Sequence, residues 1–326
     1  MPDGARPPVV ALFGATGLGK TDVAVSLAGL LGAEIVVADS MQVYRGLPVL
    51  TNQPSPEQRA RVRYHLVSVI DPRAEWSVAA YAEAAHAAIE DILRRDLPVV
   101  VEGGSGLYLR AALGDLVFAG RPDAAVRREL EAAWARDPGV LISELRALDP
   151  VTAARLDLAN PRRVVRALEA ARSLGRPLRE SERDRLWRPA ERYAHRLFAL
   201  EPDRRRLRRR VDARVDAMLA AGALDEVRRA RAAGPLSRTL RQAIGVRELL
   251  AVLDGDLDAD AAAASMRART HALVRRQLTW MRKLPEAVRE PAAERPAEEL
   301  AAALLSRLSF DSTDASGRPG LHETPW

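Results

Sequence analysis

One stretch near the N-terminus combines residue types and spacing that suit chemistry on phosphates. Gly14-x-x-x-x-Gly19-Lys20-Thr21 matches the phosphate-loop pattern in full. Glycines let backbone N–H groups approach one centre, and Lys20 adds a full positive charge to the partial charge of a helix N-terminus. Thr21 is suited to hold a Mg²⁺ ion that bridges phosphate oxygens. The pattern predicts that a phosphorylated ligand binds Gly14, Ala15, Thr16, Gly17, Leu18, Gly19, Lys20 and Thr21.

The elements that must position this loop are visible on both sides of it. Residues 9–13 are all apolar and predict a buried strand, and apolar residues recur at helical spacing from Lys20 to Leu31. The alternative is a chance glycine-rich turn between a strand and a helix. Lysine occurs only at Lys20 and Lys283 among 50 lysines and arginines. A lysine kept inside the loop therefore indicates a site that requires a slim ammonium group rather than a planar guanidinium.

Two acids follow predicted strands and are further candidates. Asp39 comes after the predicted buried strand 33–38, and ligands of doubly wound sheets lie outside the carboxyl ends of such strands. Asp39 could bind Mg²⁺ through water or act as a general base; the alternative is an aspartate that only caps the next turn. Glu102 ends the predicted strand 98–102 and precedes a glycine turn. It is either a second acid of the site or a buried, paired structural acid.

Composition limits the class of protein. The chain has 326 residues, no cysteine, a net charge of +6 and a pI near 10.2. No apolar run approaches the roughly 18 residues that span a membrane, and the N-terminus has no apolar signal-peptide core. A soluble cytoplasmic protein without disulfides or thiolate metal sites is expected. Arginine is concentrated in residues 204–210 and 265–283, which could face a polyanion, although a genome rich in arginine codons would give the same composition.

The order of the predicted elements indicates an α/β domain with an insertion. Strands are expected at 65–70 and 195–200, and a helix capped by Ser77 at 78–95. Further helices are expected at 107–113, 127–136, 140–148, 162–174, 202–221, 224–233, 240–253 and 261–282. We predict a phosphate-loop NTPase-like parallel sheet flanked by helices, formed by residues 1–119 and 191–308. An inserted all-helical domain is expected at residues 120–190, and residues 309–326 would be a disordered tail.

Several local patterns together resemble the bacterial tRNA dimethylallyltransferases, also called tRNA isopentenyltransferases. The resemblance covers residues 9 to about 308. It is carried by the phosphate loop, Asp39-Ser-Met-Gln-Val-Tyr-Arg-Gly46, Gly103-Gly-Ser-Gly-Leu-Tyr-Leu-Arg110, Asn160-Pro-Arg-Arg-Val-Val-Arg-Ala-Leu-Glu169, Ile244-Gly-Val-Arg-Glu-Leu249 and Arg276-Gln-Leu-Thr-Trp-Met-Arg282. The loop occurs in many families, whereas the Asp-Ser-x-Gln-x-Tyr and Arg-Gln-x-Thr-Trp blocks are far more specific.

The resemblance implies a reaction and a set of roles. A dimethylallyl group would move from its pyrophosphate to N6 of the adenosine 3′-adjacent to the anticodon of a tRNA. Lys20, Thr21 and Arg214 would hold the pyrophosphate with Mg²⁺, and Asp39 would act as the general base. Ser40, Met41 and Gln42 would line the pocket of a flipped adenine, and the helical insertion would bind the anticodon arm. The residues implied in binding the tRNA anticodon stem-loop are Asp39, Ser40, Met41, Gln42, Ser105, Arg127, Arg162, Arg163, Val164, Val165 and Arg166. The enzyme is expected to be a monomer.

The chain departs from the family pattern at three places. Leu50-Thr-Asn-Gln-Pro54 lacks the lysine of the family's Gly-Thr-Ala-Lys-Pro, Ser105 replaces a threonine, and Glu102 stands where a glycine or an apolar residue is commoner. Three other functions compete with the transferase. A phosphate-loop kinase of a small metabolite would need ATP. An isopentenyltransferase of free adenine nucleotides would need no basic helical insertion, and an RNA-binding module without activity leaves Lys20 and Asp39 unexplained.

Overall fold

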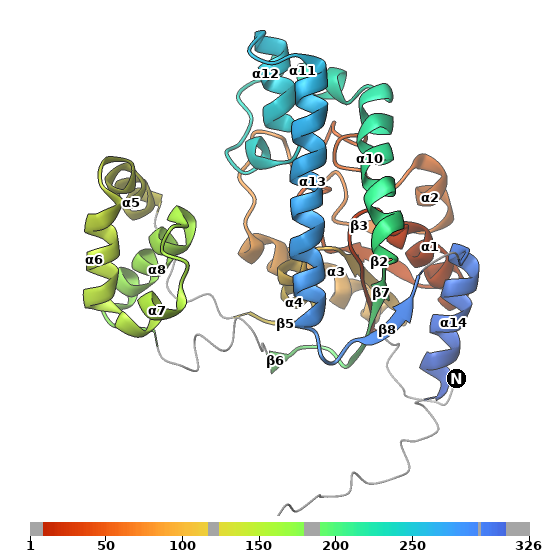
Figure 1. Cartoon of the computed structure of the whole chain (residues 1–326). Coiled ribbons are helices and arrows are strands. Elements are labelled where there is room, and N and C mark those ends of the chain that lie inside the picture. Colours follow the sequence, from red (N-terminus) through yellow and green to blue (C-terminus); the bar gives the residue numbers. More distant parts are fainter. Residues whose placement is uncertain (1–8, 117–123, 179–189, 293–294, 311–326) are drawn as a thin grey trace, which may run out of the picture. The chain divides into compact units, whose positions relative to one another are not determined.

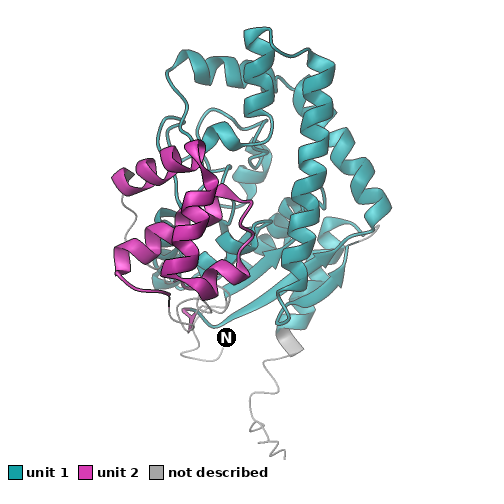
Figure 2. Cartoon of the chain, turned by 60° about the vertical axis from the view of Figure 1, so that its left-hand side comes forward, with its two compact units in different colours: residues 1–113, 193–326 teal, residues 114–192 magenta. Residues whose placement is uncertain are grey.

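The chain folds into two compact units, which Figure 2 distinguishes by colour. A computed structural model describes residues 9–116, 124–178, 190–292 and 295–310. The core unit comprises Met1–Leu113 and Tyr193–Trp326, and the helical unit comprises Gly114–Arg192. None of the described helices is both long and apolar enough to cross a membrane.

A parallel sheet lies at the centre of the core unit (Figure 1). Its six strands have the order β3-β2-β4-β1-β7-β8, and each neighbouring pair is parallel. The strands are β1 Val9–Phe13, β2 Glu34–Val37, β3 Tyr64–His65, β4 Val99–Gly103, β7 His195–Glu201 and β8 Val288–Pro291. Every residue of β1 and β4 is buried, because interior strands of a parallel sheet are covered on both faces. This confirms the predicted fold class.

Helices cover both faces of this sheet. The connection from β1 to β2 leads toward one edge and the connection from β3 to β4 returns, so right-handed crossovers place α1 and α3 on opposite faces. The core-unit helices are α1 Lys20–Leu31, α2 Pro56–Arg61, α3 Val78–Arg94, α4 Gly106–Leu113, α10 Arg204–Ala220, α11 Ala223–Ala232, α12 Val246–Asp254, α13 Ala259–Arg282 and α14 Ala297–Phe310, with a 3₁₀ helix η1 at Leu240–Gln242. Val10 and Leu12 of β1 belong to one apolar cluster with residues of α1 and α14.

The helical unit has its own apolar core. Its helices are α5 Ala124–Arg136, α6 Pro138–Leu148, α7 Pro150–Arg155 and α8 Pro161–Leu174, and β5 Gly114–Asp115 pairs antiparallel with β6 Ala190–Glu191. Leu130, Leu145 and Leu168 are completely buried in its centre. Asp137, Asp149 and Asn160 each cap a helix whose first residue is proline, which explains the three Asx-Pro pairs of this unit.

Some predicted elements were wrong in extent. The strand expected at 65–70 ends at His65, because Leu66 and Ser68 adopt positive φ angles of 62° and 56°. The helix expected at 240–253 is divided into η1 and α12, because Gly245 has φ 95°. Helices α2, α7 and α14 and strand β8 were not predicted. Helix α14 includes the first two residues of the expected tail, and residues 311–326 lie outside the described residues.

Candidate active site

The phosphate loop (residues 14–21) joins the carboxyl end of β1 to the first turn of α1. Gly17 and Gly19 have φ angles of 90° and 75°, which glycine adopts without a steric penalty. The loop lines a cavity of about 340 Å³, called the loop cavity below, together with Asp39, Gln42, residues 51–53 and Arg214. A helix N-terminus that opens into a cavity is a favourable place for a phosphate group.

Lys20 is held by a buried acid at the end of the neighbouring strand. Its Nζ lies 3.2 Å from Oε2 of Glu102, whose residue is only 1% exposed. Glu102 is opposite Leu12 in the register of β4 with β1, so its side chain starts beside the loop. Both alternatives for Glu102 are therefore observed: it is an acid beside the phosphate loop, and it is buried and paired. An ammonium group has three donors, so the pairing leaves Lys20 donors for a phosphate.

Asp39 caps the next turn with one carboxylate oxygen, and its other oxygen accepts no hydrogen bond from a described residue. Its Oδ1 accepts hydrogen bonds from the backbone N–H of Met41 at 2.8 Å and of Gln42 at 3.3 Å. The capping alternative is thus observed. The second oxygen, Oδ2, has no hydrogen-bond partner among the described residues. The cap fixes the carboxylate in one orientation, which is a requirement for a general base.

A second cavity of about 290 Å³ adjoins the loop cavity. Residues that line both are Thr16, Asp39, Thr51, Gly104, Arg214 and Gln277. Of the residues predicted to line the adenine pocket, Ser40 and Met41 line the second cavity, whereas Gln42 lines the loop cavity. Ser105, which was predicted to bind tRNA, also lines the second cavity. The two cavities therefore meet at one anionic and one cationic side chain, Asp39 and Arg214.

Burial governs the electrostatics around this junction. It lowers the pKa of the Arg214 guanidinium, and the charge of Asp39 opposes that shift. Burial also raises the pKa of Tyr81 and of Tyr108, whose ring centroids are 4.6 Å apart, and the Asp39 charge acts in the same direction. Both phenols therefore stay neutral beside the Asp39 carboxylate.

Sequence reasoning assigned no role to Gln277, which ties the loop to α13. The backbone N–H of Thr16 donates to Oε1 of Gln277 at 2.9 Å. One turn later, Trp280 covers Gly106 so closely that a Cβ on this glycine would stand 2.4 Å from its ring. The specific Arg-Gln-x-Thr-Trp block thus packs on the glycine turn after β4. The spacing of Gln277 and Trp280 on one helix face was the signal available in the sequence.

Hydrogen bonds to Glu226 and Tyr44 fix the atypical loop at residues 50–54, which lacks the family's lysine. The Glu226 carboxylate accepts from the backbone N–H groups of Val49 and Leu50 at 2.8 and 2.9 Å. Gln53, at the place of the family's lysine, is buried and donates to the Tyr44 carbonyl at 2.6 Å. The loop cavity therefore receives polar but uncharged side chains from this segment.

The residues of the helical unit predicted to bind tRNA divide into two groups. Arg162 and Arg163 are exposed at the start of α8. Val164 and Val165 are 0% and 4% exposed within the apolar core, so their side chains are not at the surface and a contact with RNA would have to come from their backbone. Arg127 and Arg166 bind the buried Glu169 carboxylate at 2.6 and 2.8 Å, which neutralises part of their charge.

A metal ion at this site would need phosphate oxygens of the bound substrate to complete its coordination. Within the described residues no group of three or more His, Asp or Glu side chains could hold a metal ion. The Thr21 hydroxyl has no hydrogen-bond partner among the residues that the structure describes. The Thr21 hydroxyl would hold Mg²⁺ together with phosphate oxygens and waters, which suits an ion that retains several waters in phosphate sites.

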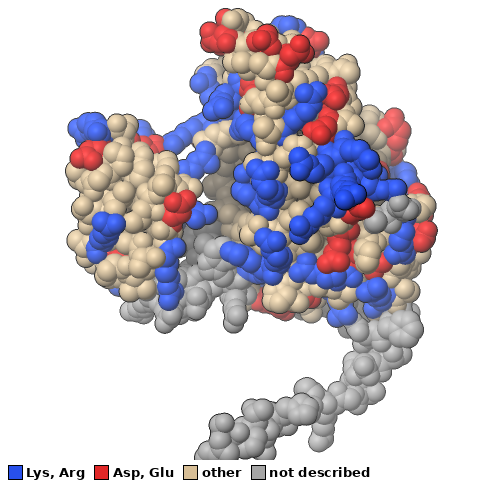
Figure 3. Space-filling model, in the orientation of Figure 1, with Lys and Arg blue, Asp and Glu red and all other residues tan. Residues whose placement is uncertain are grey.

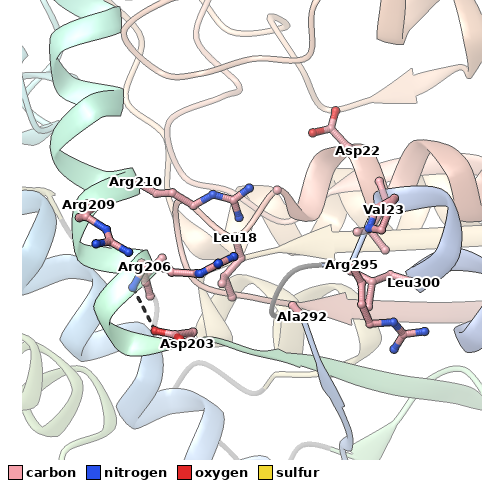
Figure 4. Close-up of a pocket in the computed structure, with 14 residues that line it drawn as sticks. Leu18, Asp22, Val23, Asp203, Arg206, Arg209, Arg210, Ala292, Arg295 and Leu300 are labelled. Carbon is pink, nitrogen blue, oxygen red and sulfur yellow. Dashed lines mark hydrogen bonds between the residues drawn. The ribbon is translucent and has the colours of Figure 1, made fainter.

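The arginine-rich stretches differ in their surroundings. Figure 3 shows basic side chains gathered over α10, where all six arginines of residues 204–210 are exposed. Arg206, Arg209 and Arg210 rim a cavity of about 520 Å³ that shares Leu18, Gly19 and Asp22 with the loop cavity (Figure 4). In α13, by contrast, Arg267, Arg269 and His271 pair with acids of other helices, Asp216, Glu248 and Asp212. Only part of that predicted basic stretch is available to a polyanion.

Known proteins match both the sequence and the fold. Residues 42–284 match the sequence model of the family described as IPP transferase. The tRNA dimethylallyltransferase of Thermomicrobium roseum is 39% identical over 86% of this chain and 85% of its own length, and that of Anaeromyxobacter dehalogenans is 43% identical over 84% and 92%.

Solved structures agree with the sequence matches. The tRNA isopentenylpyrophosphate transferase of Bacillus halodurans superposes with a TM-score of 0.68 at 30% identity, covering 96% of this chain and 100% of that one. A eukaryotic dimethylallyltransferase acting on tRNA superposes with a TM-score of 0.73 at 25% identity, covering 97% and 81%. From the family match, the curated relatives and the shared fold, we conclude that this chain belongs to the IPP transferase family.

Proposed function

We propose that this protein modifies tRNA by transferring a dimethylallyl group from dimethylallyl pyrophosphate to N6 of the adenosine 3′-adjacent to the anticodon. The observation that supports this reaction best is the junction of two cavities at Asp39 and Arg214. A pyrophosphate on the phosphate loop and an adenine in the second cavity would meet there. The curated relatives, named tRNA dimethylallyltransferases, support the same reaction.

In the proposed reaction the phosphate loop stabilises the negative charge of the leaving pyrophosphate. The bond between the allylic carbon and the pyrophosphate oxygen breaks, and the bond from that carbon to N6 forms. Lys20, Arg214 and the N–H groups at the start of α1 stabilise the charge that develops on the pyrophosphate. Bound Mg²⁺ would neutralise further phosphate charge, and Thr21 is the residue that would hold it.

Asp39 would accept the proton that N6 loses. The lone pair of N6 is delocalised into the adenine ring, so the nitrogen gains nucleophilicity only as its proton is shared or removed. Oδ2 of Asp39 is the carboxylate oxygen without a hydrogen-bond partner among the described residues, and the cap at Met41 keeps it in place. A base so positioned typically contributes about 10²–10⁴-fold to the rate.

An adenine reaches an enclosed site only outside its base stack. The second cavity offers Met41, Met218 and Trp280 as apolar surfaces and Ser40 and Ser105 as hydroxyls for a flipped base. We propose that Arg162 and Arg163 of the helical unit bind phosphates of the anticodon arm. We also propose that the enzyme is a monomer and acts in the cytoplasm, where its tRNA substrate is found.

A direct comparison of ligands and acceptors tests this function against its competitors. Radiolabelled dimethylallyl pyrophosphate and ATP are offered to the protein with Mg²⁺, followed by tRNA or AMP as acceptor. We expect binding of the prenyl donor and label transfer to tRNA alone. Phosphoryl transfer from ATP would support a kinase, and transfer to AMP would support the enzyme of free nucleotides; either result would overturn the proposal.

A further inference from the structure

Glu102 has one carboxylate oxygen that no described residue satisfies. Its Oε2 binds Nζ of Lys20 at 3.2 Å, whereas Oε1 is buried and has no hydrogen-bond partner. A carboxylate oxygen has lone pairs for at least one donor, and burying it unpaired is costly. An orphaned charged oxygen beside the lysine of a phosphate loop therefore indicates a missing donor.

The missing donor is either a water shared with Tyr64 or a water bound to a metal ion. The Tyr64 hydroxyl is also buried without a partner, and burial together with the Glu102 charge raises the pKa of Tyr64, so the phenol stays protonated. A water between the two would give Glu102 a purely structural role. A water bound to a metal ion would instead give it a role in the reaction, because enzymes with a phosphate loop pair the loop's Ser or Thr with an acid at the same Mg²⁺.

We propose that Glu102 is a positioning residue of the metal–pyrophosphate site, an inference that rests on the proposed function. Oε2 holds the Lys20 ammonium toward the phosphates, and Oε1 accepts a hydrogen bond from a water of the Mg²⁺ that Thr21 coordinates. Partners of this outer shell orient metal ligands and typically change metal affinity by about 10–100-fold.

The charges of the pair give this role a distinctive consequence. Glu102 cancels the charge of Lys20, so the loop without metal offers little net attraction to pyrophosphate. Mg²⁺ restores the attraction and uses Glu102 to do so. Removing the Glu102 charge should therefore strengthen pyrophosphate binding without metal and weaken the additional gain from Mg²⁺. A structural defect would change both affinities in the same direction.

Calorimetry with inorganic pyrophosphate tests the proposal on the full-length protein. Affinity is measured in EDTA and in Mg²⁺ for the wild type, Glu102→Gln and the control Tyr64→Phe. We expect the gain from Mg²⁺ to fall at least about tenfold in Glu102→Gln, with tighter binding in EDTA, and to stay unchanged in Tyr64→Phe. An unchanged gain in Glu102→Gln, or an equal loss in Tyr64→Phe, would overturn it.

Two measurements remain decisive if Glu102→Gln fails to fold. Wild-type protein that binds pyrophosphate equally well in EDTA and in Mg²⁺ contradicts the proposal by itself. Because Lys20 and Lys283 are the only lysines, ¹⁵N-lysine labelling gives two side-chain signals, and Lys283→Arg identifies that of Lys20. We expect Mg²⁺ to shift the Lys20 signal only when pyrophosphate is present. Wild-type protein that binds no pyrophosphate under either condition would instead overturn the proposed function.

Discussion

The cations of this molecule occur in two contrasting settings. At the phosphate loop the cations are few and largely buried: Lys20 pairs with Glu102 of β4, and Arg214 lies within the electrostatic influence of Asp39. On α10 and at the start of α8 the arginines are numerous and exposed, and Arg163, Arg209 and Arg210 pair with no other described side chain. The first setting suits one ligand held in one geometry, and the second suits a polyanion read through many weak contacts.

Solvent explains why these settings should behave differently. A charge in a dry site interacts several times more strongly than one in water, and salt screens it poorly. Exposed ion contacts are individually worth little but add up along a nucleic acid, with a strong dependence on salt. Single substitutions should therefore have large effects at the loop and small ones on the exposed surfaces, and the following predictions test that contrast.

The largest effect is expected for Lys20→Ala. This substitution removes the one full positive charge of the phosphate loop and leaves Glu102 buried without its partner. Breaking a buried ion pair typically costs about 3–5 kcal/mol of stability. The remaining carboxylate would also repel the donor. We expect pyrophosphate affinity to fall by about 100-fold, since a hydrogen bond to a charged group contributes up to about 3 kcal/mol and the repulsion by Glu102 adds to its loss.

The double variant Lys20→Met/Glu102→Val separates these two effects. It removes both charges, so thermal unfolding should return toward that of the wild type while turnover stays low. Near-normal turnover in either variant would contradict the assignment of the loop as the pyrophosphate site.

The next effect is expected for Asp39→Asn. Asparagine also caps turns, so the contacts to Met41 and Gln42 should persist, while the charge on the remaining oxygen disappears. The single-turnover rate should fall by about 10²–10⁴-fold with nearly unchanged affinities for donor and tRNA. A collapse of donor affinity in Mg²⁺ would instead favour a role of Asp39 at the metal.

A smaller effect is expected for Gln277→Leu, which keeps the volume but removes the acceptor of the Thr16 N–H. An unsatisfied buried donor costs about 1–3 kcal/mol, so the loop should lose order and the donor should bind about tenfold more weakly. Hydrogen exchange of the Thr16 amide reports the loop directly. The neighbouring Thr279→Val, which alters an exposed hydroxyl of the same helix, should leave both measurements unchanged.

Local patterns predicted much of this core because they act over short distances. Residues 9–13 and the glycines of the loop specify a strand, a turn and a helix within one segment, and the structure follows them. The extent of β3 was missed, since an apolar run at 65–70 does not reveal that Leu66 and Ser68 turn with positive φ. Helix α7, with six residues, was too short for its periodicity to be recognised.

Long-range partners were beyond the sequence. The contact of Glu102 with Lys20 spans 82 positions and that of Gln277 with Thr16 spans 261. Neither follows from spacing, because it depends on which strands become neighbours and on where α13 returns. The same limit applies to Val164 and Val165, since only the packing of α8 decides which side of the motif after Asn160 faces solvent.

The smallest effect is expected on the exposed surface of the helical unit. The guanidinium of Arg163 makes no hydrogen bond or ion pair with another described residue, whereas Arg172 binds the carboxylates of Glu129 and Glu144 at 3.0 and 2.8 Å. Arg163→Ala should weaken tRNA binding a few-fold at low salt and reduce the salt dependence of log K by about 0.7–0.9, the value for one phosphate contact. Arg172→Ala serves as the matched control, because its charge is already neutralised, and should leave that slope unchanged. Equal slopes for the wild type and Arg163→Ala would exclude a phosphate contact at this position, and Arg209 and Arg210 of α10 would become the next candidates.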